Sequence, residues 1–452
     1  MPRSTDARIR TLLLACAALC PAAVGAQDPS APVAPPVVVA PDEVDFEGLT
    51  SLSLVSGARA LGMGGAFLAR ADDATAVSWN PAGLSYLGRP EFSIVGTRNS
   101  FERGPAGSPP NDRFAGYGPD FLAVTYPLSR GAIQLNYQRV FSFSGTRDIV
   151  RETDVFETEG AGGFDVLGLG TGVRLGRKVR VGGAFNLWLN GYSQRRVRVT
   201  TRPPPRGRGV TEQDIDYDLD SGVNFNVGLL FSPVESLNLG VVGRTPFTAI
   251  LNLRRFRRDF GPSISEDEFT QNAGERSDVL IDLPGSVGLG ASWRATSAFT
   301  ISADYTRTFW SEGRIRNFFT VEPTPEDGDA PPPQTFASLP YPTLDDPDQV
   351  DTQQVRMGAE YVLIAGRVRF PLRVGLFVDR QYFRAAPGIP GNRGEAPWFR
   401  GYTAGTGVSV GPMLVDIALV HERGAFRSRD DLAEVETRFT RAVVSLTYRP
   451  GS

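Results

Sequence analysis

The sequence predicts an all-β fold, a transmembrane antiparallel β-barrel of about 14 strands, and three observations support this. The N-terminus has the pattern of an export signal, yet no later stretch approaches the roughly 18 apolar residues of a helical span. From Glu91 onward, apolar and polar residues alternate in segments divided by turn residues. The connections between these segments alternate strictly between short and long, which is typical of barrels with short periplasmic turns and long outer loops.

Composition excludes several classes of function. The 452 residues include 47 Lys and Arg and 50 Asp and Glu, with a formal net charge of -3, so the basic excess of nucleic-acid-binding proteins is missing. One histidine and two cysteines nearly exclude a Cys/His zinc site. We therefore expect no metal, no cofactor, no nucleic-acid partner and no enzymatic activity.

Residues 1–26 match a secretory signal peptide. A basic start is followed by a short apolar run, and Ala26 completes a small-x-small cleavage pattern. Both cysteines, Cys16 and Cys20, lie in this segment, so the exported chain folds without disulfides. Residues 27–45 are rich in proline and valine, which predicts an extended linker.

The remaining 89–452 region is predicted to form the barrel, with segments long enough to cross a membrane at a tilt. The predicted strands cover 91–98, 120–128, 131–143, 164–175, 179–195, 215–232, 237–254, 278–294, 299–312, 352–364, 368–382, 399–411, 413–422 and 436–449. The long connections between them include 99–119 and 144–163.

Side-chain parity assigns the two faces of each strand. In the segment 352–364, Val355 and Met357 share one face, and Arg356 and Glu360 share the other. In lipid the apolar set must face outward, so the polar set lines a lumen. Aromatic residues at segment ends fit interfacial girdles: Tyr126, Trp310, Tyr382, Trp398 and Tyr448.

A barrel of this size encloses more space than side chains fill, so a plug is expected. Residues 46–88 are the candidate for this hatch, and the part over 57–87 is rich in glycine. Asp72 and Asp73 suit turn caps, and Asn80-Pro81 predicts the end of a short helix. The "GMGG" run does not indicate a phosphate loop, because no Gly-Lys-Ser/Thr and no βαβ pattern surround it.

The string "GARALGMGGAFLARADDATAVSWNPAGLSYLGRPEFS" resembles the N-terminal hatch of the FadL/TodX (OmpP1) family of outer-membrane transporters. A second string, "LPGSVGLGASWRATSAFTISADYTRTFWSEGRI", resembles the middle hairpin of that family. Strand number and loop parity extend the resemblance over nearly all of the exported chain. The hatch residues that carry it are Gly62, Gly64, Asp72, Asp73, Asn80, Pro81 and Ala82.

The resemblance implies a location in the cell outer membrane, insertion by the barrel-assembly machinery, and transport of long-chain fatty acids or similar hydrophobic compounds. Cargo would be captured among the outer loops, held in the lumen and released when the hatch shifts. In that family a kink in the third strand opens the wall sideways. Here the polar face of the third segment, ending at Gln138, breaks at "RVFSF", which predicts a bulge.

Four lumen-side residues are the predicted ligand site. Trp188 and Phe377 would supply apolar walls, and Arg356 and Arg373 would hold a carboxylate. The same parity places Leu230, Val362, Leu414 and Arg441 on the lumen side. The alternative for each arginine is a salt bridge inside the lumen, with Glu360, Asp379 or Asp416 as the partner.

The outer connections are charged rather than apolar. Residues 194–208 and 254–258 are basic, and the connection over 322–350 is acidic and rich in proline. The basic stretches would attract anionic ligands or bind the phosphates of lipopolysaccharide, alongside other outer-membrane lipids.

Three other functions stay open at this point. PorV-type barrels share the hatch pattern, so the chain would serve as an anchor or shuttle for secreted proteins. A membrane-embedded hydrolase would need His421 as its base, although no motif supplies a serine. A general porin is disfavoured by a well-formed hatch.

Overall fold

The structure, a computed structural model, describes residues 55–150, 154–201, 208–260, 270–321, 350–383, 394–427 and 433–451. The predicted signal peptide, the predicted linker and the first part of the predicted hatch, 46–54, lie outside the described residues.

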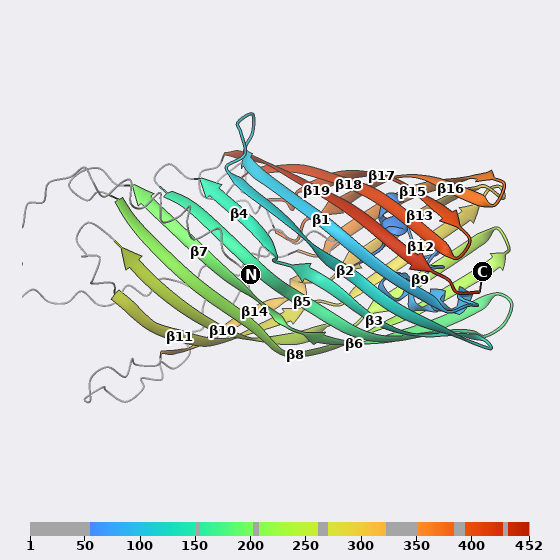
Figure 1. Ribbon diagram of the computed structural model, residues 1–452, viewed down its shortest axis with the longest axis horizontal. Coiled ribbons are helices and arrows are strands. Elements are labelled where there is room, and N and C mark those ends of the chain that lie inside the picture. Colours follow the sequence, from blue (N-terminus) through green and yellow to red (C-terminus); the bar gives the residue numbers. More distant parts are fainter. Residues whose placement is uncertain are drawn as a thin grey trace, which may run out of the picture. The chain divides into compact units, whose positions relative to one another are not determined.

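A single antiparallel sheet closes into a barrel, because β1 pairs with both β2 and β19 (Figure 1). The strand elements are β1 (Glu91–Pro105), β2 (Asp112–Leu128), β3 (Gly131–Ser142), β4 (Gly145–Val150), β5 (Asp154–Arg174), β6 (Val179–Leu189), β7 (Gly191–Thr201), β8 (Arg208–Val234), β9 (Leu237–Arg244), β10 (Phe247–Phe260), β11 (Thr270–Leu283), β12 (Ser286–Arg294), β13 (Phe299–Thr308), β14 (Arg314–Val321), β15 (Thr352–Ala365), β16 (Val368–Arg380), β17 (Trp398–Val410), β18 (Met413–Arg427) and β19 (Glu434–Tyr448). In five cases two consecutive elements lie end to end and together form one barrel strand. These are β3 with β4, β6 with β7, β9 with β10, β11 with β12 and β13 with β14. The 19 elements therefore make 19 - 5 = 14 barrel strands, which confirms the predicted fold and strand number.

The predicted faces are confirmed as well. On β15, Met357 is 54% exposed on the outside, while Arg356 is 4% exposed on the inside. Leu376 and Val374 of β16 and Val444 of β19 are likewise exposed apolar residues on the outer face. A closed sheet with this apolar exterior satisfies its backbone internally, as a hydrocarbon surrounding requires. No helix in the described part of the chain is long and apolar enough to cross a membrane.

The strands extend well beyond their predicted outer ends. Most of the connections predicted over 99–119 and 144–163 are strand, because β1 runs to Pro105 and β5 begins at Asp154. These extensions carry polar residues on both faces, so the period-two contrast that marks a half-buried strand is absent from them. Hydrogen bonding to the neighbouring strand continues the ladder where hydrophobic patterning stops.

The hatch lies inside the barrel, as predicted (Figure 1). It contains the short helices α2 (Ala58–Gly62) and α3 (Ala76–Trp79) and the 3₁₀ helix η3 (Pro81–Tyr86). Helix α2 packs against the wall formed by β16 to β19, and η3 packs against β3, β5, β6 and β8. Its own core includes Leu61, Phe67, Trp79 and Leu84, all almost completely buried.

Two glycines of the wall let the hatch backbone approach closely. A side chain at Gly182 of β6 would collide with the backbone of Pro81, and one at Gly375 of β16 would collide with that of Gly64. The hatch backbone therefore packs directly on these two strands.

Candidate functional site: a cavity between the hatch and the barrel wall

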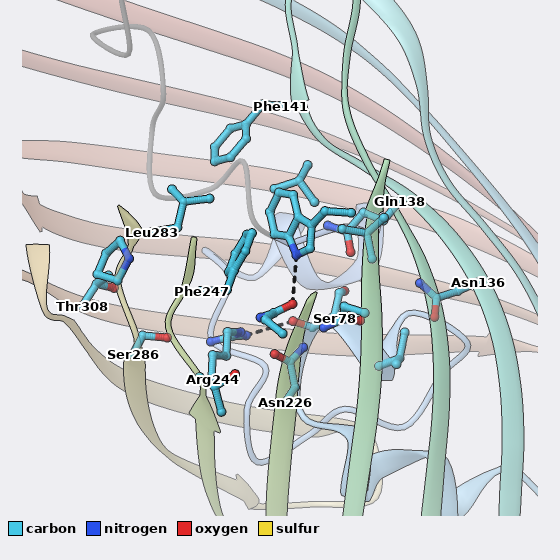
Figure 2. A pocket seen from close by; sticks show the side chains of 18 of the residues that line it. Ser78, Asn136, Gln138, Phe141, Asn226, Arg244, Phe247, Leu283, Ser286 and Thr308 are labelled. Atoms are coloured by element: carbon cyan, nitrogen blue, oxygen red, sulfur yellow. Dashed lines mark hydrogen bonds between the residues drawn. The ribbon is translucent and has the colours of Figure 1, made fainter. Parts of the chain in front are cut away.

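A cavity of about 80 Å³ lies between the hatch and one side of the barrel (Figure 2). Val77 and Ser78 of α3 contribute the hatch side. The wall side comes from strands β3, β5, β6 and β8 to β13, together with Trp310 of the 3₁₀ helix η4 (Trp310–Glu312). Trp310, predicted as an interfacial girdle residue, instead lines this cavity.

One side of the cavity is apolar and aromatic. The Trp188 ring lies 4.7 Å from the Phe247 ring and 6.2 Å from the Phe141 ring, measured between centroids. Leu283 and Val140 complete this side. The aromatic cluster continues beyond the cavity through ring contacts among Phe143, Phe164, Tyr192 and Tyr217.

The opposite side of the cavity is polar but nearly uncharged. Side-chain amides line it from the barrel strands β3, β6 and β8: Asn136, Gln138, Asn186, Asn224 and Asn226. Asn224 accepts a hydrogen bond of 2.9 Å from the Trp188 indole, which orients that ring. Arg244 is the single charged residue in the described lining, and no Asp or Glu contributes to it.

In the wall next to the cavity, strand β2 is not paired with β3 or β4 over a short stretch. Strand β2 pairs with β3 up to Phe121 and Gln138, and pairing resumes with β4 at Gly116 and Gly145. Residues 117–120 on one side therefore face residues 139–144 on the other, four residues against six. A register shift against β5 between Arg139 and Phe141 confirms the predicted bulge in "RVFSF".

A row of aromatic rings leads from the cavity toward the outer ends of the strands. The Trp310 ring lies 5.3 Å from the Tyr382 ring. Tyr382 contacts Phe383 at 5.7 Å, and Phe383 contacts Phe426 at 5.0 Å. All four rings are half-buried, so they form a partly open apolar surface above the cavity.

The structure does not bring the four predicted ligand residues together. Trp188 lines the cavity, whereas Phe377, Arg356 and Arg373 lie against the hatch on other strands and are absent from the lining. Phe377 packs over Gly401, and the Arg356 guanidinium lies directly against Gly65 of the hatch. The ligand role of all three stays a prediction, while the contacts of Arg356 and Arg373 join the wall to the hatch.

Arg373 takes part in a buried ionic network that joins the hatch to the wall. It donates to Glu360 at 2.7 Å and to Asp416 at 2.6 Å. Salt bridges with these two acids are the alternative to a ligand role that the sequence indicates. Arg59 and Arg70 of the hatch also bind Glu360. Burial lowers the pKa of Arg59, but the surrounding carboxylates outweigh it and hold that pKa well above its usual range.

Among the predicted hatch residues, the two glycines contact the wall and the two aspartates contact other parts of the hatch. The Gly62 carbonyl accepts a hydrogen bond from Thr403 on the wall, and the Gly64 amide donates to the same hydroxyl, both at 2.9 Å. Gly64 has a φ of 69°, a conformation that favours glycine. Asp72 binds Arg59 at 2.7 Å rather than capping a turn, while Asp73 caps locally by accepting from Thr75.

Asn80, Pro81 and Ala82 form the junction at which α3 ends and η3 begins, as the turn signal predicts. The Asn80 side chain accepts from the Ala82 amide at 3.1 Å, which caps η3. Its amide group donates to the carbonyls of Leu68 and, on the wall, Leu229. One side chain thus ties two hatch segments to the barrel.

The described part of the basic stretch over 194–208 is strand, and two of its arginines have acidic partners. Arg198 of β7 pairs with Asp154 at 3.1 Å, and Arg195 lies 3.8 Å from Glu212. Side chains over 255–258 and the connection over 322–349 lie outside the described residues. His421 contacts the Thr440 hydroxyl at 2.9 Å and the Tyr402 ring at 5.2 Å between centroids. In the described part of the chain, no cluster of three or more His, Cys, Asp or Glu could hold a metal ion.

Solved structures with similar folds include a Pseudomonas aeruginosa FadL homologue, at 13% identity and a TM-score of 0.60 over 87% of this chain and 98% of that one. The Ralstonia pickettii toluene transporter TbuX matches at 14% identity and a TM-score of 0.56, covering 88% of this chain and 98% of its own. The CymD monoaromatic hydrocarbon channel has the same four values. No protein-family model matches the chain, and neither does any curated protein. The likeness establishes the fold, a barrel of the FadL type with an N-terminal hatch in its lumen.

Proposed function

We propose that this chain is an outer-membrane transporter that carries hydrophobic compounds from the cell exterior through the barrel and releases them under control of the hatch. The observation that carries this proposal is the position of the cavity, which touches α3 of the hatch on one side and the unpaired stretch of β3 on the other. A molecule bound there contacts both the plug and the weakest part of the wall.

The aromatic surfaces support a route into and out of this cavity. The half-buried row from Phe426 to Trp310 offers apolar contacts to a molecule arriving from outside. Residues 117–120 and 139–144, which are not paired with each other, offer a sideways exit into the membrane. The toluene transporter and the monoaromatic hydrocarbon channel among the similar folds agree with hydrophobic cargo.

Cavity size limits what the docked hatch can accommodate. About 80 Å³ is well below the roughly 300–1,000 Å³ of common ligand pockets. The predicted long-chain fatty acid would place only part of its length here, with the remainder along the aromatic row. Complete passage therefore requires the hatch to shift.

The first test is ligand binding to the purified protein, with Trp188→Ala as the variant. We expect affinity for a hydrophobic probe to fall about thirtyfold, since removing a central buried tryptophan from a binding site costs about 2 kcal/mol. Displacement of a fluorescent probe by toluene, an alkane and palmitate provides the measurement. Phe377→Leu is the matched control, because that ring lies outside the cavity. An equal loss in both variants would instead assign Phe377 the predicted ligand role.

The proposal as a whole fails if none of these compounds binds and a secreted protein co-purifies in stoichiometric amount. That result would support the alternative function, an anchor or shuttle for secreted proteins, because PorV-type barrels share the hatch pattern.

The second test closes the proposed exit. Deleting Phe143 and Ser144 leaves 6 - 2 = 4 residues opposite the four over 117–120, so pairing can extend across this stretch apart from Pro119, which has no N–H to donate. We expect uptake to fall to background while cavity binding persists, and amide exchange of Tyr117, Gly118 and Asp120 to slow. Deleting Ala106 and Gly107, at the tip of the β1–β2 turn, is the matched control. Wild-type uptake through a barrel with pairing extended in this way would rule out this exit.

A further inference from the structure

Arg244 of β9 is a cation in the cavity with no carboxylate partner among the described residues. Its Nη2 donates to the hatch carbonyl of Ser78 at 2.9 Å (Figure 2). It also donates to the carbonyl of Trp79 at 3.3 Å. No other hydrogen bond of Arg244 is present in the described structure, so further N–H groups remain for a ligand. A guanidinium with free donors and no neighbouring acid favours an anion.

Three amide atoms of the same cavity lining are also buried without a hydrogen-bond partner in the described structure. They are Asn136 Oδ1, Gln138 Nε2 and Asn226 Oδ1, and all three side chains belong to the cavity lining. Buried polar groups of this kind are normally satisfied by a partner, water or ligand. A plain hydrocarbon would leave them unpaired, which is costly. Gln138 Nε2 is the donor among them that a carboxylate can satisfy, whereas the two amide oxygens accept and need a donor such as water.

The opposite side selects the shape of the remaining part of the ligand. Trp188 and Phe247 are tilted by 34° at 4.7 Å, and Trp188 is held by its bond to Asn224. Oriented aromatic rings favour a flat ring as a neighbour. The small volume of the cavity favours a compact ligand over a long chain, most of which would have to lie outside it.

We propose that the cavity binds a compact aromatic carboxylic acid in its ionised form, with the carboxylate on Arg244 and the ring against Trp188 and Phe247. This inference rests on the proposed transport function and names the class of cargo for the same site. It replaces Arg356 and Arg373 with Arg244 as the group that holds the carboxylate.

The same contact connects cargo to the hatch. A carboxylate is a stronger acceptor for a guanidinium than the peptide carbonyls of Ser78 and Trp79, so bound cargo competes with the hatch for Arg244. Trp79 in turn donates through its indole to the Ser56 carbonyl at 2.7 Å, and the Ser56 hydroxyl binds Asp120. Asp120 belongs to the unpaired stretch of β2. Loss of the Arg244 bonds therefore loosens a chain of contacts that ends at the proposed exit.

The test compares benzoate with toluene, which share a ring and differ in the carboxylate. We expect calorimetry on the full-length protein to give benzoate an affinity roughly tenfold to hundredfold above that of toluene. Benzoate, unlike toluene, is expected to increase amide exchange over 76–82 of the hatch. Arg244→Gln should lower the affinity for benzoate much more than that for toluene, so that the preference for benzoate is lost.

Two further variants keep the result decisive if Arg244→Gln disturbs the hatch. Arg244→Lys retains the charge and should retain part of the preference. Arg180→Gln removes a guanidinium of β6 that lies over the Tyr86 ring at 4.1 Å and is not in the cavity, so it should change nothing. Equal binding of toluene and benzoate, or binding of toluene alone, would overturn the inference and leave the transport proposal standing. Failure of every hydrophobic compound to bind would overturn both.

Discussion

Transport is expected to stop when the hatch is covalently tied to the wall by a disulfide between Gly62→Cys and Arg373→Cys. A Cβ atom at Gly62 lies 3.5 Å from the Cβ of Arg373, within the range of natural disulfides. The same atom lies 3.1 Å from the Gly405 Cα, so the wall must yield by a few tenths of an ångström. The two native cysteines both lie in the predicted signal peptide, so this pair has no competitor in the exported chain.

The physical reason is that the hatch fills the lumen and release requires it to move. The measurement is uptake of a labelled hydrophobic compound into cells or proteoliposomes, before and after reduction. We expect background uptake in the oxidised form and recovery on reduction. Arg373→Cys alone controls for loss of the salt bridges to Glu360 and Asp416. Wild-type uptake by the oxidised double variant would show that the hatch stays in place during transport.

The second large effect is expected from Glu360→Gln, which removes the central acceptor of the ionic network. Glu360 is 3% exposed and binds Arg59 and Arg70 from the hatch and Arg373 from the wall. Removing one partner from a buried ion pair costs about 3–5 kcal/mol, because the remaining charges stay buried without compensation. Here those charges lie on both sides of the contact between hatch and wall, so much of the cost falls on docking of the hatch.

We expect Glu360→Gln to raise single-channel conductance and to make the hatch sensitive to added protease. The matched control is Glu436→Gln, whose pair with Arg438 is 3.0 Å long and exposed to solvent. Exposed pairs contribute roughly 0–1 kcal/mol, so this control should behave as the wild type. A closed, protease-resistant hatch in Glu360→Gln would mean that the remaining anchors, such as Thr403 and Asn80, suffice.

Much of the barrel follows from local sequence features. Period two assigns a face to each residue, which is why Arg356 and Glu360 face inward and Met357 outward as predicted. Asn80-Pro81 places the break between two short helices, because an N-cap side chain followed by proline starts a new turn. The bulge at "RVFSF" is visible as a break in the polar alternation.

The outer parts of the strands and the unpaired stretch depend on neighbours in the sheet. Residues over 99–105 have no apolar alternation and are strand because β2 and β19 continue alongside them. The mismatch of four residues against six appears only when β2 is aligned with both β3 and β4. No property of either segment alone contains that difference.

The sequence by itself determined the closed sheet, its two faces and the segment that plugs it, because these depend on local periodicity and composition. The tertiary structure alone decided which inward residues share a cavity. Parity places Trp188, Phe377, Arg356 and Arg373 on the lumen side, but only Trp188 lines the cavity, and Arg244 joins it there. The physical reason is that parity specifies a face and leaves open both the position around the barrel and the path of the hatch backbone, which covers some inward side chains and leaves others open to cargo.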